Sequence, residues 1–379
     1  MMAGLRVLLT NNTLCGRAGT ELYVRDIALG LMERGHQPIA YSSKLGEVAE
    51  ELRAATIPVI DDLNRLRDAP DIIHGHHYAP TMVALDRWPT VPAIHVCHDH
   101  ASPDDRTPIH PNISRYFGVS RVCVRRLIAE GVPEVDTGLF LNFVDLARFV
   151  PRAPLPERPR RALVFSNYAT EDTHLPAVRE ACRAAALELD VVGAGVGRIV
   201  GTPERLLGDY DIVFAKAKAA MEAMAVGSAV ILCDFNGIGP MVTTAEFDRL
   251  RPLNFGFEAL RDPLRPEFLL REIARYDAAD ALRVRDCLRS GAGLAAAVDN
   301  LERIYRRTID EHPRRRPGTS IQRLALRQRL FLRLYWSWRN RPTASRDRIA
   351  ALPGGRHVVR VTKRLLGAGG RSSEGIRES

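Results

Sequence analysis

Short apolar runs alternate with amphipathic segments along most of the chain, and this alternation predicts a fold of the α/β class. Residues 5–12 read LRVLLTNN, a run of strand-forming side chains that ends in polar ones. Residues 19–36 follow with apolar side chains at helical spacing and end beside Gly35, a common helix stop. The same order recurs downstream. Strands that alternate with helices imply parallel sheets covered on both faces.

The alternation is interrupted once. Residues 149–161, FVPRAPLPERPRR, are rich in proline and arginine and are typical of an exposed linker. The pattern then resumes and ends in a helical segment at residues 279–310. We therefore expect two doubly wound α/β domains, residues 1–150 and 151–312, and a tail over residues 313–379. Two such domains facing each other form a cleft, and their sheets bind ligands outside the carboxyl ends of the strands.

Composition is that of an ordinary globular protein, with 379 residues of which 46% are hydrophobic and 26% charged. The six cysteines lie far apart without C-x-x-C spacing. A zinc or redox motif is therefore not expected. We expect the protein in a reducing compartment, the cytoplasm. The apolar run at the N-terminus is too short for a signal peptide, and no stretch approaches the roughly 20 apolar residues of a membrane span.

The net charge of +9 is unevenly distributed. Residues 313–379 contain 17 Lys and Arg against three Asp and Glu, a net charge of +14, which leaves −5 for residues 1–312. The tail also contains the aromatic residues Phe331, Tyr335, Trp336 and Trp338. A basic helix with aromatic anchors is typical of a segment on an anionic membrane, so we expect a peripheral contact at its inner face. A flexible basic extension is the main alternative. Nucleic acid is not expected as a partner, because the body resembles no nucleic-acid module.

Two glycines lie close to the start of the first predicted helix. Gly16 and Gly19 fall in the loop after the first strand. The amide groups at a helix start attract anions, and glycine lets a ligand approach the backbone closely. This arrangement favours a phosphate or sugar contact. A plain turn in which Thr20 caps the helix is the alternative.

Histidines form two clusters at the ends of predicted strands, where a doubly wound sheet places its site. The clusters comprise His74, His76, His77, His95, His98 and His100, with Asp99 between the last two. We interpret His98 and Asp99 as a pair for polar binding or proton transfer. A metal site is a weaker interpretation, because no third ligand is evident. Purely structural roles remain open for His74, His77 and His95.

One carboxylate interrupts an otherwise apolar helix. Glu222 lies in AKAAMEAMAVG, residues 217–227, whose flanking side chains predict burial. A buried carboxylate needs partners, and a pair of ligand hydroxyls would supply them. A solvated carboxylate paired with Lys218 is the alternative. The glycines of DFNGIGPMV, residues 234–242, could expose amides to a pyrophosphate. A carboxylate for a ribose and amides for a pyrophosphate are what a nucleotide sugar requires.

In this order and spacing, several segments resemble those of the GT-B glycosyltransferases, specifically the large retaining group of glycosyltransferase family 4. The resemblance covers residues 5–256. It rests on GTELYVRDIALGLMERGH, DIIHGHH, GVSRVCVRRLIAEGVPE, LNFVDLARF, DVVGAG and MEAMAVGSAVILCD. The resemblance implies two Rossmann-like domains that bind a nucleotide-sugar co-substrate, with no cofactor and no metal.

The resemblance also implies roles for individual residues. His98 would contact the transferred sugar. Together with Asp99 of the histidine cluster and Lys216, a neighbouring cation, it forms the expected catalytic group. Glu222 would bind the donor ribose, and Gly19 would lie near the donor phosphates. The remaining expected contacts are Gly239, Pro240, Met241 and Val242 beside the donor phosphates, and Gly16 and His76 on the acceptor side.

The chain departs from the family pattern at several positions, of which three concern the donor site. The first of two family glutamates corresponds to Phe214, and the donor-clamping Arg and Lys correspond to Asn167 and Asp172. Two cations that would stabilise a departing diphosphate are replaced, and Lys216 or Lys218 could substitute for them.

The sequence therefore predicts a retaining, hexosyltransferase-like enzyme that moves a sugar from a nucleotide donor to a glycan or lipid-linked acceptor. Such a reaction belongs to the synthesis of cell-surface polysaccharides or glycoconjugates. The alternative is a catalytically silent member that binds a glycan or nucleotide within an assembly.

Overall fold

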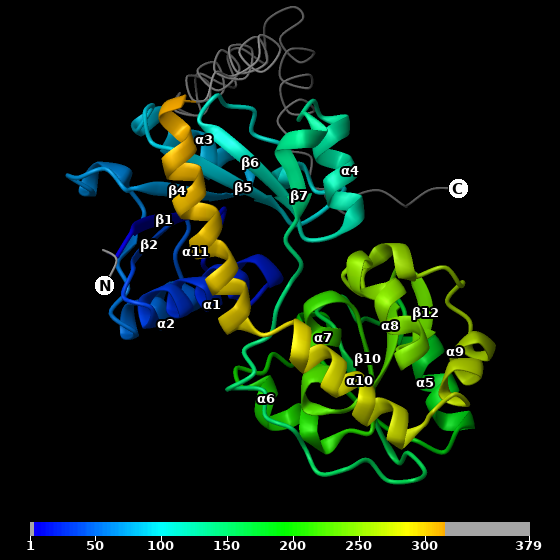
Figure 1. Cartoon of the computed structure of the whole chain (residues 1–379). Helices are drawn as coiled ribbons and strands as arrows, with labels where there is room; N and C mark the ends of the chain where they lie inside the picture. Colours follow the sequence, from blue (N-terminus) through cyan, green and yellow to red (C-terminus); the bar gives the residue numbers. More distant parts are fainter. Residues whose placement is uncertain (1–3, 315–379) are drawn as a thin grey trace, which may run out of the picture.

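The computed structural model describes residues 4–314 of the chain, which form two α/β domains (Figure 1). Each domain has one sheet with helices packed against it. The expected α/β fold with two doubly wound sheets is therefore confirmed. The basic tail lies outside the described residues, apart from its first two residues.

The first sheet has seven strands in the order β3-β2-β1-β4-β5-β6-β7, and all of its neighbouring strands are parallel. Its strands are β1 (Arg6–Thr10), β2 (Gln37–Tyr41), β3 (Val59–Ile60), β4 (Ile72–His76), β5 (Ala93–Cys97), β6 (Ile113–Gly118) and β7 (Thr137–Leu139). The helices between them are α1 (Gly19–Glu33), α2 (Glu47–Ala54), α3 (Tyr78–Arg87) and α4 (Arg121–Ala129).

The second sheet has five strands in the order β12-β11-β10-β8-β9, and only the pairing of β12 with β11 is antiparallel. Its strands are β8 (Arg161–Phe165), β9 (Glu188–Val192), β10 (Ile212–Ala215), β11 (Ala229–Asp234) and β12 (Gly237–Met241). The remaining helices are α5 (Leu175–Ala184), α6 (Pro203–Leu206), α7 (Ala217–Val226), α8 (Thr244–Leu250), α9 (Pro266–Ile273), α10 (Ala278–Gly291) and α11 (Leu294–Glu311).

Helix α1 forms as its apolar pattern predicts. Tyr23, Ile27 and Leu31 lie at helical spacing, and all three are buried against the first sheet. The helix ends before Gly35, whose φ of 78° an L side chain rarely adopts. The alternative in which Thr20 caps this helix is wrong: the helix begins at Gly19, and the Thr20 hydroxyl donates to Oε2 of Glu21 inside the first turn.

Helix α11 differs from the domain assignment that the sequence suggested. It lies in the range expected for the second domain, yet its buried residues Val298, Leu301 and Tyr305 belong to the core of the first. Figure 1 shows it running from the second domain back along the first. A Cβ at Gly30 of α1 would lie 2.7 Å from Cγ2 of Val298, so glycine permits this close helix contact.

The chain crosses between the domains twice, and the two crossings are hydrogen-bonded to each other. The Val144 amide donates to the Ala292 carbonyl, and the Leu294 amide donates to the Val144 carbonyl, both at 2.8 Å. Residues 149–160 after the first crossing contain no helix or strand, as their proline content predicts.

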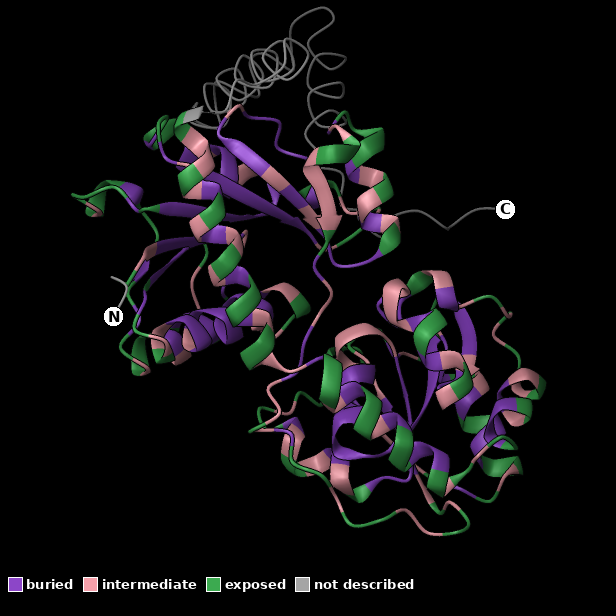
Figure 2. Ribbon diagram, in the orientation of Figure 1, coloured by how far each residue is buried: buried purple, intermediate pink, exposed green. Residues whose placement is uncertain are grey.

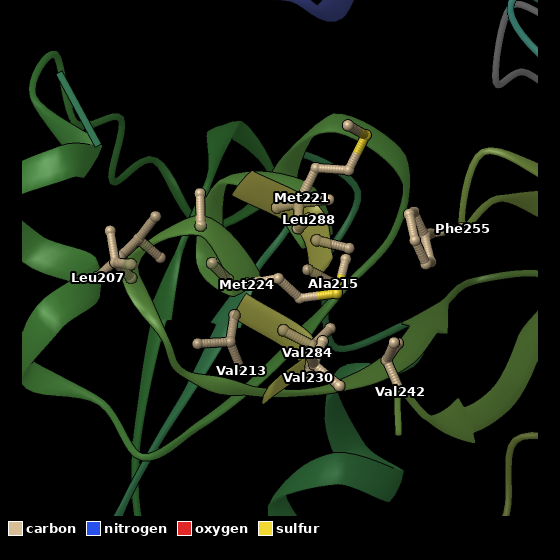
Figure 3. Close-up of a cluster of buried hydrophobic side chains, with 14 of the residues drawn as sticks. Leu207, Val213, Ala215, Met221, Met224, Val230, Val242, Phe255, Val284 and Leu288 are labelled. Atoms are coloured by element: carbon tan, nitrogen blue, oxygen red, sulfur yellow. The ribbon is translucent and has the colours of Figure 1, made fainter. Parts of the chain in front are cut away.

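Both sheets are buried between their helices, as the burial colouring shows (Figure 2). In the second domain, Met221 and Met224 of α7 pack on Val213 of β10 and Val230 of β11 (Figure 3). This core fixes α7 against its sheet, and the start of the helix lies at the carboxyl end of β10. Within residues 4–314, no helix is both long and apolar enough to cross a bilayer.

Candidate functional site

Residues at the carboxyl ends of the two sheets meet at the boundary between the domains. Lys218 of α7 donates to Oδ2 of Asp26 of α1 at 2.8 Å. His100, in the loop after β5, stacks on Phe257 of the second domain with ring centroids 4.4 Å apart. The strand ends that the sequence singled out in each half are therefore brought to one region.

Two histidines of the first domain are hydrogen-bonded to each other there. His76 ends β4 and His98 follows β5, and Nδ1 of His76 lies 2.8 Å from Nε2 of His98. Burial holds the pKa of both imidazoles well below the ordinary value, so both rings are neutral near neutral pH. His74, deeper in the same strand, is 2.6 Å from the Tyr305 hydroxyl of α11, which indicates a structural role.

The expected pairing of His98 with Asp99 is wrong. Strand β5 ends at Cys97, so the loop turns Asp99 outward, where its Oδ1 accepts the amides of Ala101 and Ser102 at 2.6 and 2.9 Å. Asp99 is an exposed residue of the domain boundary and not the partner of the histidine.

The buried acid beside the histidines is Asp105, which the sequence analysis missed. Its Oδ1 accepts the His98 amide at 2.8 Å, and its Oδ2 lies 3.8 Å from Nε2 of His77. The His77 ring accepts the Asn12 amide at Nδ1, so its proton lies on Nε2 and faces Asp105. No local pattern separates Asp105 from its neighbour Asp104, since both occupy one polar turn. Among residues 4–314, no group of three or more potential ligands is arranged to hold a metal ion.

Both glycines of the first loop lie beside open space. A Cβ added to Gly16 or Gly19 would meet no atom within 4 Å. Gly19 is the first residue of α1, whose first turn carries amides that lack acceptors within the helix. The arrangement is compatible with the expected ligand contact at this loop.

Glu222 is buried at the same boundary, as the sequence predicts, with 5% of its surface exposed. The alternative of a solvated carboxylate is therefore wrong. Lys218 lies 3.9 Å from Glu222 but is turned towards Asp26. Burial raises the pKa of the Glu222 carboxyl to about 6, Lys218 lowers it in part, and the charge of Asp26 raises it further.

A short series of contacts connects Glu222 to His98 across the boundary. The Lys218 ammonium lies 5.4 Å from the ring centroid of Phe143, and that ring lies 4.9 Å from Tyr23. Tyr23 in turn contacts the His98 ring at 4.8 Å. A carboxylate of one domain and a neutral imidazole of the other therefore lie on either side of a small group of aromatic rings.

Lys216 is the single residue between β10 and α7. Its ammonium pairs with the buried Asp234 at the end of β11. Phe214, at the position of the first family glutamate, lies within β10 and is buried in the core on the α5 side. An acidic side chain at position 214 would therefore point into this core and not towards a ligand.

The positions of the missing donor clamp have other roles. Asn167 accepts the Ala194 amide on its side chain at 3.1 Å and the Gly195 amide on its carbonyl at 3.0 Å. Asp172 is exposed. Asn167 therefore holds two loops of the second domain together.

The segment expected beside the donor phosphates is an edge strand instead of a loop before a helix. Gly239, Pro240 and Met241 lie in β12, which runs antiparallel to β11, and Val242 follows it. The Met241 amide donates to Oε2 of Glu272 and the Val242 amide to the Val230 carbonyl, both at 2.8 Å. Proline has no amide hydrogen, and a Cβ at Gly239 would lie 2.7 Å from the Ala259 carbonyl oxygen. The amides of Met241 and Val242 are therefore already bonded and Pro240 has none, so these three residues offer no amide to a phosphate in this arrangement.

The chain is similar to known proteins in the sequence of its first domain and in its fold. Residues 17–148 match the model of Glycosyltransferase Family 4. No curated protein sequence matches the chain. Its fold is similar to that of HepE from Anabaena in complex with UDP and glucose, with 15% identity, a TM-score of 0.58, and 79% of this chain and 99% of that chain covered.

Two further solved structures share the fold. A glycosyltransferase from Rickettsia africae matches with 14% identity and a TM-score of 0.57, covering 81% of this chain and 99% of that one. Sucrose-phosphate synthase from Thermosynechococcus elongatus matches with 14% identity and a TM-score of 0.55, covering 80% and 98%. Residues 17–148 are therefore similar to Glycosyltransferase Family 4, and both domains share the two-domain GT-B fold of these solved structures.

Proposed function

We propose that the chain transfers a sugar from a nucleotide-sugar donor to a carbohydrate acceptor with retention of the anomeric configuration. The observation that carries this proposal is the buried Glu222 of one domain, placed across the boundary from the neutral His98 of the other. The structure of HepE contains UDP and glucose, which supports a uridine diphosphate sugar as the first donor to test.

In the proposed complex, the Glu222 carboxylate accepts hydrogen bonds from the ribose hydroxyls. The diphosphate lies at the start of α7, where Lys216 and Lys218 supply positive charge and the helix dipole adds to it. Each lysine exchanges its present carboxylate, Asp234 or Asp26, for a phosphate oxygen. His98, neutral and held by His76, then bonds a hydroxyl of the transferred sugar.

Transfer proceeds on the face that the leaving group occupies. The bond between the anomeric carbon and the phosphate oxygen breaks, and the acceptor oxygen forms its bond to that carbon on the same face. The departing phosphate takes the acceptor proton, so no protein nucleophile is required. Electrostatic stabilisation of the departing diphosphate is then the main contribution of the protein.

The acceptor in this proposal is a glycan or a lipid-linked glycan bound against the first domain. The net charge of +14 in residues 313–379 supports contact with an anionic membrane surface, at about 1 kcal/mol per cation. A chain that ends at Pro313 should then sediment less with anionic vesicles than the full chain does. Equal sedimentation of the two chains would exclude the tail as the anchor.

A catalytically silent binder is the second candidate, and the ion pairs of the two lysines favour it. Asp234 and Asp26 already neutralise Lys216 and Lys218, and Asn167 and Asp172 replace the clamp of the family. Such a protein would bind a nucleotide or glycan without releasing a diphosphate.

A thermal-shift panel tests the donor site. Full-length protein is heated with UDP-, GDP- and ADP-sugars and with the free nucleotides, and a ligand of the folded state raises the midpoint by mass action. Glu222→Ala should abolish the shift, because losing a buried hydrogen-bond acceptor costs about 1–3 kcal/mol of binding. An equal shift in both proteins would contradict the ribose assignment. A Glu222-dependent shift without nucleotide diphosphate release, with any acceptor tried, would select the silent binder.

A further inference from the structure

The hydrogen bond between His76 and His98 admits two arrangements of its hydrogen. Nδ1 of His76 lies 2.8 Å from Nε2 of His98, and both rings are neutral near neutral pH. One of these two nitrogens therefore carries the hydrogen and the other accepts it. The choice matters for a ligand, because it decides whether the second nitrogen of His98 is a donor or an acceptor.

The second nitrogen of His76 is enclosed in the first domain. His76 is fully buried at the end of β4, and its Nε2 has no hydrogen-bond partner among residues 4–314. The ring of Tyr23 lies 5.2 Å from that of His76, and its hydroxyl is also buried without a partner within the same range. A hydrogen on Nε2 of His76 would therefore meet no acceptor in this arrangement.

The burial of this nitrogen distinguishes the two arrangements. If His98 donated the shared hydrogen, the hydrogen of His76 would lie on Nε2 as a buried N–H group without an acceptor. If His76 donates from Nδ1, its Nε2 is a bare nitrogen that lacks only a donor. Buried N–H groups without acceptors are rarer in folded proteins than buried acceptors without donors. Donation by His76 is thus the favoured arrangement.

The second nitrogen of His98 has different surroundings. His98 follows β5 and is partly exposed, whereas His76 is fully buried. Because Nε2 of His98 is bonded to His76, Nδ1 is the ring nitrogen left for a ligand. The neighbouring acid does not occupy it, since Asp105 accepts the backbone amide of His98 and faces His77 with its other oxygen.

We propose that His76 donates from Nδ1 to Nε2 of His98, which places the hydrogen of His98 on Nδ1 and makes this histidine a hydrogen-bond donor to the sugar. His76 is then a positioning residue, because it acts on the sugar through His98. The sugar group that His98 recognises must present an oxygen lone pair, as a hydroxyl, a ring ether or a carboxylate does. A deoxy position or a protonated amino group offers no acceptor and is disfavoured. The inference rests on the proposed function, because it names the class of sugar that the same site takes.

The positions of the hydrogens can be measured on the full-length chain without a ligand. Long-range 1H–15N correlation spectra of protein labelled with 15N-histidine distinguish a protonated ring nitrogen from a bare one. The chain has 11 histidines, and the signals that His76→Asn and His98→Asn remove assign the two rings. Near neutral pH, we expect hydrogen on Nδ1 and a bare Nε2 in both rings. A hydrogen on Nε2 of either ring would overturn the inference.

Two substitutions of His98 test its donor towards the sugar. The side-chain amide of asparagine lies close to the position of Nδ1, whereas that of glutamine lies closer to Nε2. The affinity for UDP-glucose relative to UDP, measured by titration calorimetry, should fall about tenfold in His98→Gln, which corresponds to about 1.4 kcal/mol. It should fall less in His98→Asn. Equal losses, or a larger loss in His98→Asn, would contradict a donor at Nδ1.

Substitutions of His76 test its positioning role. His76→Leu removes the donor to His98, so the His98 hydrogen should be shared between its two ring nitrogens and UDP-glucose should lose affinity relative to UDP. His76→Asn supplies an amide donor and should restore both properties in part. A purely structural role would weaken UDP and UDP-glucose alike and would show no rescue by asparagine. Tyr23→Phe is the control: it removes only the unpartnered hydroxyl and should leave the hydrogens of both histidines in place.

The spectra separate this inference from the proposed function, because they require no ligand. If UDP and UDP-glucose bind the unaltered chain equally, or if neither binds, the proposed sugar contact fails and the spectra alone decide the inference. If UDP-glucose binds more tightly than UDP while the hydrogen of His98 lies on Nε2, the proposed function stands and the inference is overturned.

Discussion

Replacing Glu222 with glutamine should stabilise the protein near neutral pH. Burial raises the pKa of this carboxyl from an ordinary value of 4.5 to about 6, so the folded protein favours its protonated form. Its stabilising contribution is fully present below about pH 4.5 and is lost as the pH rises through about 6. Glutamine is isosteric with the protonated carboxyl and stays uncharged at every pH.

The difference between the two pKa values sets the magnitude. A rise from 4.5 to about 6 corresponds to about 2 kcal/mol, so Glu222→Gln should increase the free energy of unfolding by about 2 kcal/mol at pH values above about 7. The increase should shrink to a few tenths of a kcal/mol near pH 4. Urea unfolding followed by circular dichroism across this range measures both values.

Glu272 provides a matched control in the same domain. It is also buried, but its carboxylate accepts the Met241 amide and is bonded by Arg271 and Arg275. Glu272→Gln should therefore destabilise the protein by about 1–3 kcal/mol. Destabilisation by Glu222→Gln at neutral pH, or a gain that does not depend on pH, would refute the argument. A buried carboxylate that lowers the stability of the folded protein is typical of a group that is retained because it binds a ligand.

Two further predictions concern contacts between elements far apart in the sequence. Gly30→Ala should lower the free energy of unfolding by about 1–3 kcal/mol, because the new methyl group would press on Val298. Adding Val298→Ala should recover part of this loss. Strictly additive losses of the two variants in urea unfolding would contradict the contact. Lys218→Met should cost about 1–3 kcal/mol of the free energy of unfolding, because the buried Asp26 loses one of the two cations with which it pairs. An unchanged urea midpoint would show that the pair across the boundary contributes nothing.

The alternating pattern was sufficient to predict the fold because the central strands are buried on both faces and each helix buries one apolar side against them. The same reasoning predicted the burial of Glu222, since its helical neighbours are apolar on most sides. Periodicity says nothing about which sheet a helix covers. The apolar stripe of Val298, Leu301 and Tyr305 marks α11 as a packed helix, but only the folded chain shows that it packs against α1.

The site was harder to predict where the chain leaves regular structure. The position of Asp99 depends on the loop that follows β5, because this strand ends two residues before it. The glycines of residues 234–242 indicated a loop, whereas the chain uses them for a tight turn and a closely packed edge strand. Asp105 was missed for a related reason: its role depends on the His98 amide and the His77 ring, which only the tertiary structure brings to it.

The return of α11 has a consequence for synthesis of the protein. The strands of the first domain are complete at Leu139, but the helix that covers part of its core begins only at Leu294. At about 5–20 residues per second, the ribosome needs on the order of 10 s for the intervening stretch of roughly 150 residues. During that time the surfaces around Gly30 and His74, which Val298 and Tyr305 cover in the folded chain, face solvent or a chaperone. A nascent chain stalled before Leu294 should therefore be protease-sensitive in its first domain, and a resistant one would show that this domain matures without its final helix.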